Sequence, residues 1–237
     1  MIDRRPNKIC LRDDGFAIVP PFVADASMDQ LCGTLASVDD PGALRRGEVY
    51  AMRSLFDSVP EVGDFARSVA VRSLVEPVLG EGCFAVKALL LDKRPEANWT
   101  VPWHQDLAIA VRERVEAAGY GGWSEKAGVP HVIPPAGVLE GVLTVRIALD
   151  DGGAENGPLL VLPGAHGMGR LRDADIRCYR DRVAPVACPV PRGGALLMHP
   201  LLLHASHPSK SPGHRRVLHL EYAAAPLPGG VEWRWRV

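Results

Sequence analysis

The stretch NWTVPWHQD, residues 98–106, ends in an imidazole and a carboxylate that are separated by one residue. A short segment of this kind is consistent with a β-strand. On an extended strand, residues i and i+2 point to the same face, so His104 and Asp106 are expected to present their side chains together. A His-x-Asp pair alone is too short to be specific, and its meaning depends on the rest of the chain.

Further strands are predicted mainly after residue 83. Short segments rich in Val, Leu and Ile, bounded by Pro, Gly or Asp, lie at 84–91, 142–150, 157–163, 194–200 and 215–223, with an earlier one at 15–19. Because helical patterns come first and strands later, without βαβ alternation, a doubly wound parallel sheet is excluded. The sequence predicts a mainly β protein, an antiparallel barrel or sandwich with helices packed outside.

The predicted helices lie between residues 20 and 82. Apolar residues recur with helical spacing in three stripes, Met28 to Leu35, Val62 to Val69 and Val71 to Val78, and Gly80 and Gly82 end the last one. A length of 237 residues suits one domain. We therefore expect a single domain over 1–237, with a helical layer at about 20–82 and a barrel at about 83–225.

Charge and cysteine content restrict the possible partners. With 27 basic and 28 acidic residues, the chain offers no electrostatic case for nucleic acid or anionic lipid. The five cysteines form no C-x-x-C pair, no apolar leader follows the charged N-terminus, and no run is long enough to span a membrane. These features predict a cytoplasmic protein, monomeric or homodimeric, that acts on a small molecule.

A third ligand from a distant strand would complete a metal site with His104 and Asp106. Among eight histidines, His204 follows the apolar run at 196–203, where a strand would deliver it to the barrel mouth, and His199 is the rival. Two imidazoles and one carboxylate leave positions open on Fe(II) for a bidentate co-substrate and O₂.

Arg215 follows His204 by eleven residues and is followed by Arg216 and a predicted strand. Consecutive strand residues point to opposite faces, so one of these two arginines faces the barrel interior. An inward arginine can bind a carboxylate through bidentate hydrogen bonds. Ser206 has the same parity as His204 and could assist.

Several motifs in order resemble the phytanoyl-CoA dioxygenase family. They are the strand at 14–20, the segment 98–106, the segments 149–159 and 162–166, and the histidine at 204 followed by Ser206 and by Arg215. The resemblance implies a double-stranded β-helix, a jelly-roll of the cupin-like kind. It further implies Fe(II) held by His104, Asp106 and His204, with the distal carboxylate of 2-oxoglutarate held by Arg215 and Ser206.

The resemblance also implies a reaction. A 2-oxoglutarate-dependent oxygenase uses O₂, releases succinate and CO₂, and oxidises a small organic molecule. In related halogenating enzymes the carboxylate position is Gly or Ala, so Asp106 favours hydroxylation over halogenation. The alternative is a non-oxidative metal-dependent isomerase or a small-molecule binding protein on the same barrel, which would have no need for a deep carboxylate clamp.

Weaker candidates complete the predicted site. Arg146 and Thr144 share a face of the strand at 142–150, where the resemblance implies contact with the co-substrate. Predicted substrate contacts are Lys87, Gln105, Arg53 and Trp123, the last from a segment at 112–137 that is rich in Gly and Pro. A loop that long is often a lid, so we expect it to close over substrate; the simpler interpretation is a surface segment packed by its own aromatic residues, Tyr120 and Trp123. A second long connection is expected at 164–186.

Overall fold

The computed structural model describes residues 8–40, 42–46, 48–210 and 213–237. Its largest sheet has seven strands in the order β1 (Phe16–Val19), β12 (Ala195–Met198), β9 (Val142–Ala148), β14 (Arg215–Ala223), β4 (Phe84–Lys93), β3 (Glu48–Met52) and β2 (Leu44–Arg46). A second sheet contains β11 (Val186–Cys188), β10 (Leu159–Val161), β13 (His204–Ser206) and β5 (Val101–His104). Every pairing within these two sheets is antiparallel among the described residues, as predicted.

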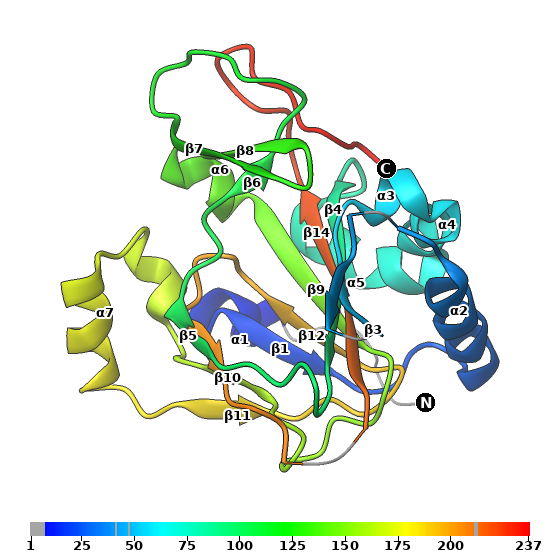
Figure 1. The fold of residues 1–237 in the computed structure, drawn as a ribbon. Coiled ribbons are helices and arrows are strands. Elements are labelled where there is room, and N and C mark those ends of the chain that lie inside the picture. Colours follow the sequence, from blue (N-terminus) through cyan, green and yellow to red (C-terminus); the bar gives the residue numbers. More distant parts are fainter. Residues whose placement is uncertain (1–7, 41, 47, 211–212) are drawn as a thin grey trace.

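The two sheets pack against each other through a shared apolar cluster. Ala148, Leu196 and Met198 of the large sheet contact Leu159 and Val161 of the small one. In Figure 1 the small sheet lies to the lower left of the large sheet, with α7 (Asp173–Arg180) beyond it. The interior between the sheets is therefore reached by one face of β9, β14 and β4, and by one face of β13.

Helices cover the opposite face of the large sheet. They are α2 (Asp25–Ser37), α3 (Leu55–Ser58), α4 (Pro60–Arg67) and α5 (Val69–Leu79), seen on the right of Figure 1. Alternate residues of β9 and β14, among them Val145, Ile147 and Leu218, pack against them in the main core. These helices lie within the segment predicted as a helical layer, but Val69 begins α5 and is 85% exposed, so it does not extend the stripe of α4.

The segment assigned to the helical layer also contributes strands. β2 and β3 lie between α2 and α3, and β3 pairs with the end of β4 through Ala51 and Met52. Only helices are predicted from the sequence in this segment. Met52 is almost fully buried, because its side chain belongs to the main core between the sheet and the helices.

The segment 112–137 is not the irregular loop that its Gly and Pro content suggests. It contains the hairpin of β7 (Gly121–Lys126) and β8 (Val129–Ile133), and β8 also pairs with β6 (Ile109–Ala110). The hairpin turns at Ala127 and Gly128, which have φ values of 49° and 75°, the signs that a tight two-residue hairpin turn requires. In Figure 1 the three-stranded sheet of β6, β7 and β8 lies at the top of the molecule. The closure of this segment over substrate stays a prediction.

The remaining elements are short helices. They are α1 (Lys8–Asp13), α6 (Ala136–Glu140) and the 3₁₀ helix η1 (Ala165–Met168), and the predicted connection at 164–186 contains η1, α7 and the start of β11. In the described part of the chain, none of the helices has the length and apolar character that crossing a membrane demands.

Tyr222 joins the helical layer to the sheet, and it provides a test of this packing. Its side chain is fully buried, and its hydroxyl donates a 2.9 Å hydrogen bond to the carbonyl of Ala66 near the end of α4. Replacing Tyr222 with Phe should lower the free energy of unfolding by about 1–3 kcal/mol, because a buried carbonyl loses its donor. Urea denaturation would measure the change, and an unchanged midpoint would mean that water replaces the hydroxyl.

Candidate metal centre

His104, Asp106 and His204 converge at one end of the small sheet. β13 pairs with β5 so that His204 lies directly opposite His104, and the two ring centroids are 4.2 Å apart. Asp106 lies two residues beyond the end of β5, where its backbone N–H donates to the carbonyl of Pro200 at 2.9 Å. Its carboxylate oxygens lie 3.6 Å from Nε2 of His104 and 3.5 Å from Nε2 of His204.

Both imidazoles are held in the orientation that a metal ion requires. Nδ1 of His104 lies 2.8 Å from the carbonyl of Pro102, and Nδ1 of His204 lies 2.9 Å from the carbonyl of Leu202. A carbonyl only accepts hydrogen bonds, so each Nδ1 carries the hydrogen and each Nε2 keeps its lone pair. Hydrogen bonds of this kind fix the tautomer of histidines that bind metals.

The charges of the three groups suit a divalent cation. Burial would raise the pKa of Asp106, but His204, His104 and Lys87 together hold that pKa well below its usual range. Burial lowers the pKa of His204 to about 4, so this imidazole is neutral at pH 7. Burial also opposes protonation of His104, but its contact with Asp106 raises the pKa of His104. Two imidazoles and one ionised carboxylate on one face form a donor set that fits iron(II).

The rival histidine lies elsewhere. His199 stacks on His166, with ring centroids 5.0 Å apart, and takes no part in any group of three potential ligands among the described residues. A second group, Asp106 with His219 and Glu221, shares its aspartate with the first. Nε2 of His219 and Nζ of Lys87 both contact Oε1 of Glu221, at 3.0 and 2.7 Å, so this second group is already engaged within the protein.

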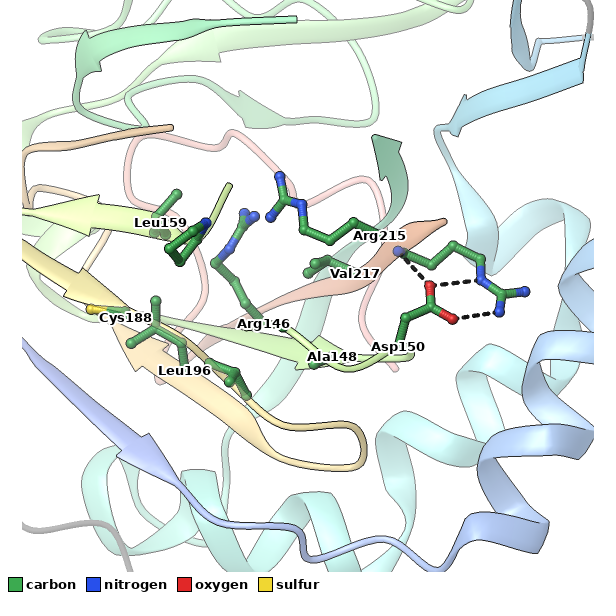
Figure 2. A pocket seen from close by; sticks show the side chains of 12 residues that line it. Arg146, Ala148, Asp150, Leu159, Cys188, Leu196, Arg215 and Val217 are labelled. Carbon is green, nitrogen blue, oxygen red and sulfur yellow. Dashed lines mark hydrogen bonds and ion pairs between the residues drawn. The ribbon is translucent and has the colours of Figure 1, made fainter. Parts of the chain in front are cut away.

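The two consecutive arginines of β14 point to opposite faces, as strand geometry requires. Figure 2 shows the guanidinium of Arg215 beside that of Arg146. Arg216 turns to the helical side, where its guanidinium donates to both carboxylate oxygens of Asp150, at 2.6 and 3.0 Å. Arg215 lines a cavity of about 40 Å³ together with Arg146, the paired Asp150 and Arg216, and apolar residues. Its Nε is buried and has no hydrogen-bond partner among the described residues.

Arg146 is tied to a chain of buried polar groups that ends near Asp106. One of its guanidinium nitrogens lies 2.9 Å from Nδ1 of His219. An arginine only donates, so Nδ1 of His219 accepts and its Nε2–H donates to Glu221, which is also paired with Lys87. Lys87 therefore faces the interior. His219 and Glu221, which the sequence analysis leaves unassigned, have the same parity as Arg215 on β14.

Thr144, Ser206 and Lys93 complete the polar interior. Thr144 is fully buried, and its hydroxyl has no partner in the described part of the chain. Ser206 is also buried and accepts a 2.8 Å hydrogen bond from Nζ of Lys93. Lys93 escapes the sequence analysis because the predicted strand stops at Leu91, whereas β4 continues to Lys93. Lys93 could have been found from its spacing, because it lies six residues after Lys87 and so points to the same face of an extended strand.

Arg53 and the tip of the hairpin lie near the outer side of the site. Lys87, Lys126 and His131 each experience the positive charge of Arg53, and Lys126 also experiences the negative charge of Asp106. Burial and these cations lower the pKa of Lys126. The hairpin predicted to cover substrate thus brings a cation toward the metal centre.

Two predicted substrate contacts have structural roles instead. The side-chain amide of Gln105 donates to the carbonyls of Gly169 and Leu201, at 2.8 and 2.7 Å, and accepts from the backbone of Leu171 at 2.8 Å. Gln105 therefore holds together the loops behind the metal ligands. Trp123 packs into the apolar cluster beneath the hairpin, with Arg114 over its ring, as the simpler interpretation of a loop aromatic expects.

Comparison with known proteins identifies the family. The model of the phytanoyl-CoA dioxygenase (PhyH) family matches residues 11–217. The chain belongs to this family. The human peroxisomal phytanoyl-CoA dioxygenase is 26% identical over 170 residues, which cover 64% of this chain and 42% of the human enzyme. The match thus spans less than half of the length of that relative.

Solved structures agree with the fold. AviO1 from Streptomyces viridochromogenes Tue57 superposes with a TM-score of 0.64 at 25% identity, covering 93% of this chain and 96% of AviO1. EctD from S. alaskensis gives a TM-score of 0.71 at 18% identity, covering 92% and 77%. The predicted double-stranded β-helix is confirmed, and so are the predicted cofactors at the level of the family, which depends on iron, 2-oxoglutarate and O₂.

Proposed function

We propose that this chain is an Fe(II)- and 2-oxoglutarate-dependent oxygenase that hydroxylates a small organic molecule. One observation carries the proposal: a two-histidine, one-carboxylate group lies within electrostatic reach of Arg146, and Arg146 lines a cavity with Arg215, whose buried Nε has no hydrogen-bond partner among the described residues. The first fits iron(II), and the second fits the distal carboxylate of a co-substrate bound at that iron. A metal-dependent isomerase or a binding protein on this fold would need only the first.

In this proposal His104, Asp106 and His204 hold the iron, and Arg215 and Ser206 hold the distal carboxylate of 2-oxoglutarate. When bound, iron and 2-oxoglutarate together convert O₂ into an oxidant and release succinate and CO₂. Arg146 and Thr144 border the co-substrate, and the hydrogen bond to His219 fixes the guanidinium of Arg146. Lys87, Arg53 and the hairpin 121–133 enclose the side on which substrate would enter, which serves to exclude water.

Hydroxylation is proposed in preference to halogenation because Asp106 occupies the position at which the carboxylate binds the metal. The fold itself permits other outcomes. Structural neighbours at 18% identity include SnoK, described as a carbocyclase, and SnoN, described as an epimerase, both dependent on α-ketoglutarate. The product therefore has to be measured rather than assumed from the fold.

Succinate formation tests the proposal directly. The purified protein with Fe(II), ascorbate and 2-oxoglutarate should produce succinate slowly without substrate, and faster when a suitable substrate is added. A screen of small organic acids, amino acid derivatives and natural-product intermediates should reveal that stimulation, and hydroxylation would add one oxygen atom to the product mass. Metal binding without any succinate, with or without candidate substrates, would favour the non-oxidative alternative.

A further inference from the structure

Three cations, one buried and two partly buried, meet at the inner end of the large sheet. They are Lys93 on β4, Arg215 on β14 and Arg146 on β9, and Arg215 is the direct cross-strand partner of Lys93. Lys93 is 1% exposed. Arg215 and Arg146 each lower the pKa of Lys93 by their charge, which places all three within electrostatic reach.

Among the residues that the structure describes, no carboxylate forms a hydrogen bond or ion pair with the side chains of these three cations, although the charge of Asp106 reaches Arg146. Lys93 donates to two neutral oxygens, the hydroxyl of Ser206 at 2.8 Å and the carbonyl of His207 at 2.7 Å. Arg146 contacts an imidazole. The carboxylate of Asp92, whose charge reaches Arg215, is engaged by His214 and by the backbone N–H of Arg215. Cations removed from solvent are normally paired with anionic groups. This cluster is therefore suited to bind an anion that a ligand supplies.

The contact with Lys93 also determines what Ser206 offers to a ligand. An ammonium group only donates, so the hydroxyl oxygen of Ser206 accepts from Lys93 and keeps its own hydrogen free to donate elsewhere. Ser206 pairs across the sheet with Leu159, which lines the cavity beside Arg215 and Arg146. It lies two residues after His204, a distance of roughly 6–7 Å along a strand. The distal end of a five-carbon dicarboxylate bound at the metal would reach this region.

We propose that Lys93 is a positioning residue of the dicarboxylate site, which holds the hydroxyl of Ser206 toward the distal carboxylate of 2-oxoglutarate and supplies a third positive charge beside it. This inference rests on the proposed function and adds a residue to it. It also predicts that binding of the dianion is coupled to protonation of the protein.

The coupling follows from the surroundings of Lys93. Burial, followed by the charges of Arg215 and Arg146, lowers its pKa to about 7 when no anion is present. The groups that face it are those two arginines, Ser206, the carbonyl of His207, and the ring of Trp99, whose centroid lies 5.6 Å from Nζ. A bound carboxylate restores a higher pKa. Below pH 7 the ammonium is already formed, and above pH 7 binding must take up a proton, so affinity falls as pH rises.

The test is calorimetric titration of 2-oxoglutarate into the Mn(II)-loaded protein, without O₂, in two buffers with different heats of ionisation. At pH 8 the wild-type protein should take up a substantial fraction of one proton, and its Kd should rise about tenfold from pH 7 to pH 9. Lys93→Met should raise the Kd at pH 7 at least tenfold and remove the proton uptake. Lys93→Arg, which stays charged, should bind within a few-fold of wild type, also without uptake.

Controls separate this role from a merely structural one. Lys210→Met removes an exposed ammonium paired with Glu155 and should change neither Kd nor proton uptake. Thermal denaturation without ligand verifies that each variant is folded, and the proton uptake of the wild-type protein needs no variant. The inference is overturned if Lys93→Met binds 2-oxoglutarate as wild type does, or if wild type binds it with no proton uptake at pH 8. Failure of wild type to bind 2-oxoglutarate would instead overturn the proposed function.

Discussion

Replacing His204 with alanine should abolish iron binding and all succinate formation. His204 is 3% exposed, and its Nε2 lies 3.5 Å from the carboxylate of Asp106 on the side facing His104. Loss of a partner that merely supports a metal ligand already weakens metal affinity by about 10- to 100-fold. Loss of one of three protein ligands should therefore weaken Fe(II) affinity by more than about 100-fold. Titration with Fe(II) under anaerobic conditions would measure the affinity, and succinate formation would measure the activity.

His199→Ala is the matched control for this prediction. Its imidazole stacks on His166 outside the metal centre, and burial lowers the pKa of His199 to about 4. The variant should lose some stability from the missing ring contact and keep the iron affinity of wild type. If His199→Ala loses iron and His204→Ala retains it, the assignment of the third ligand is wrong.

The sequence predicted well those features that depend on alternation along strands. β14 spans the predicted residues 215–223, and Arg215 and Arg216 lie on opposite faces as expected. The same rule explains an error, because Gln105 lies between His104 and Asp106 and should point away from both. Its hydrogen bonds to Gly169, Leu201 and Leu171 confirm that it does.

Other features depend on contacts that local patterns do not contain. The hairpin at 121–133 was missed because its turn places Ala127 at positive φ. Alanine rarely adopts this conformation, so its presence in the sequence does not predict such a turn. Lys93 was missed because the polar residue Asp92 ends the apolar run. Asp92 belongs to the strand because Arg216 of β14 pairs with it, and its carboxylate bonds to His214 and to the backbone of Arg215. Both partners lie more than a hundred residues away in the chain.

The polar side chains of the interior were harder to predict from the sequence than the position of the site. Lys87, Glu221, His219 and Arg146 form one hydrogen-bonded series across β4, β14 and β9. Each residue type is ambiguous in the sequence, because a single charge in an apolar strand can face either solvent or the interior. Only the register of the three strands brings them together, and that register is a property of the folded sheet.

Arg215→Met should weaken 2-oxoglutarate binding by about 100-fold, close to 3 kcal/mol, because removing one partner of a buried charge pair commonly costs 2–5 kcal/mol. The ligand-free variant should be at least as stable as wild type, since Arg215 is partly buried and its pKa is lowered to about 10 by desolvation and by the charge of Arg146. Arg216→Met is the matched control. It breaks the two-pronged contact with Asp150 on the helical side, and it should lower the free energy of unfolding by about 1–3 kcal/mol while changing the Kd for 2-oxoglutarate less than about threefold.

Two measurements on the same pair of variants separate these effects. Calorimetric titration of 2-oxoglutarate gives the affinity, and thermal denaturation with and without 2-oxoglutarate gives both the intrinsic stability and the stabilisation by ligand. Arg215→Met should lose most of the ligand-induced rise in Tm, whereas Arg216→Met should keep that rise from a lower starting Tm. The opposite pattern would place Arg216 in the dicarboxylate site and reverse the assignment of the two faces of β14. Equal loss of ligand stabilisation in both variants would mean that the distal carboxylate is held by the strand as a whole, through its position in the sheet, and not by the guanidinium of Arg215.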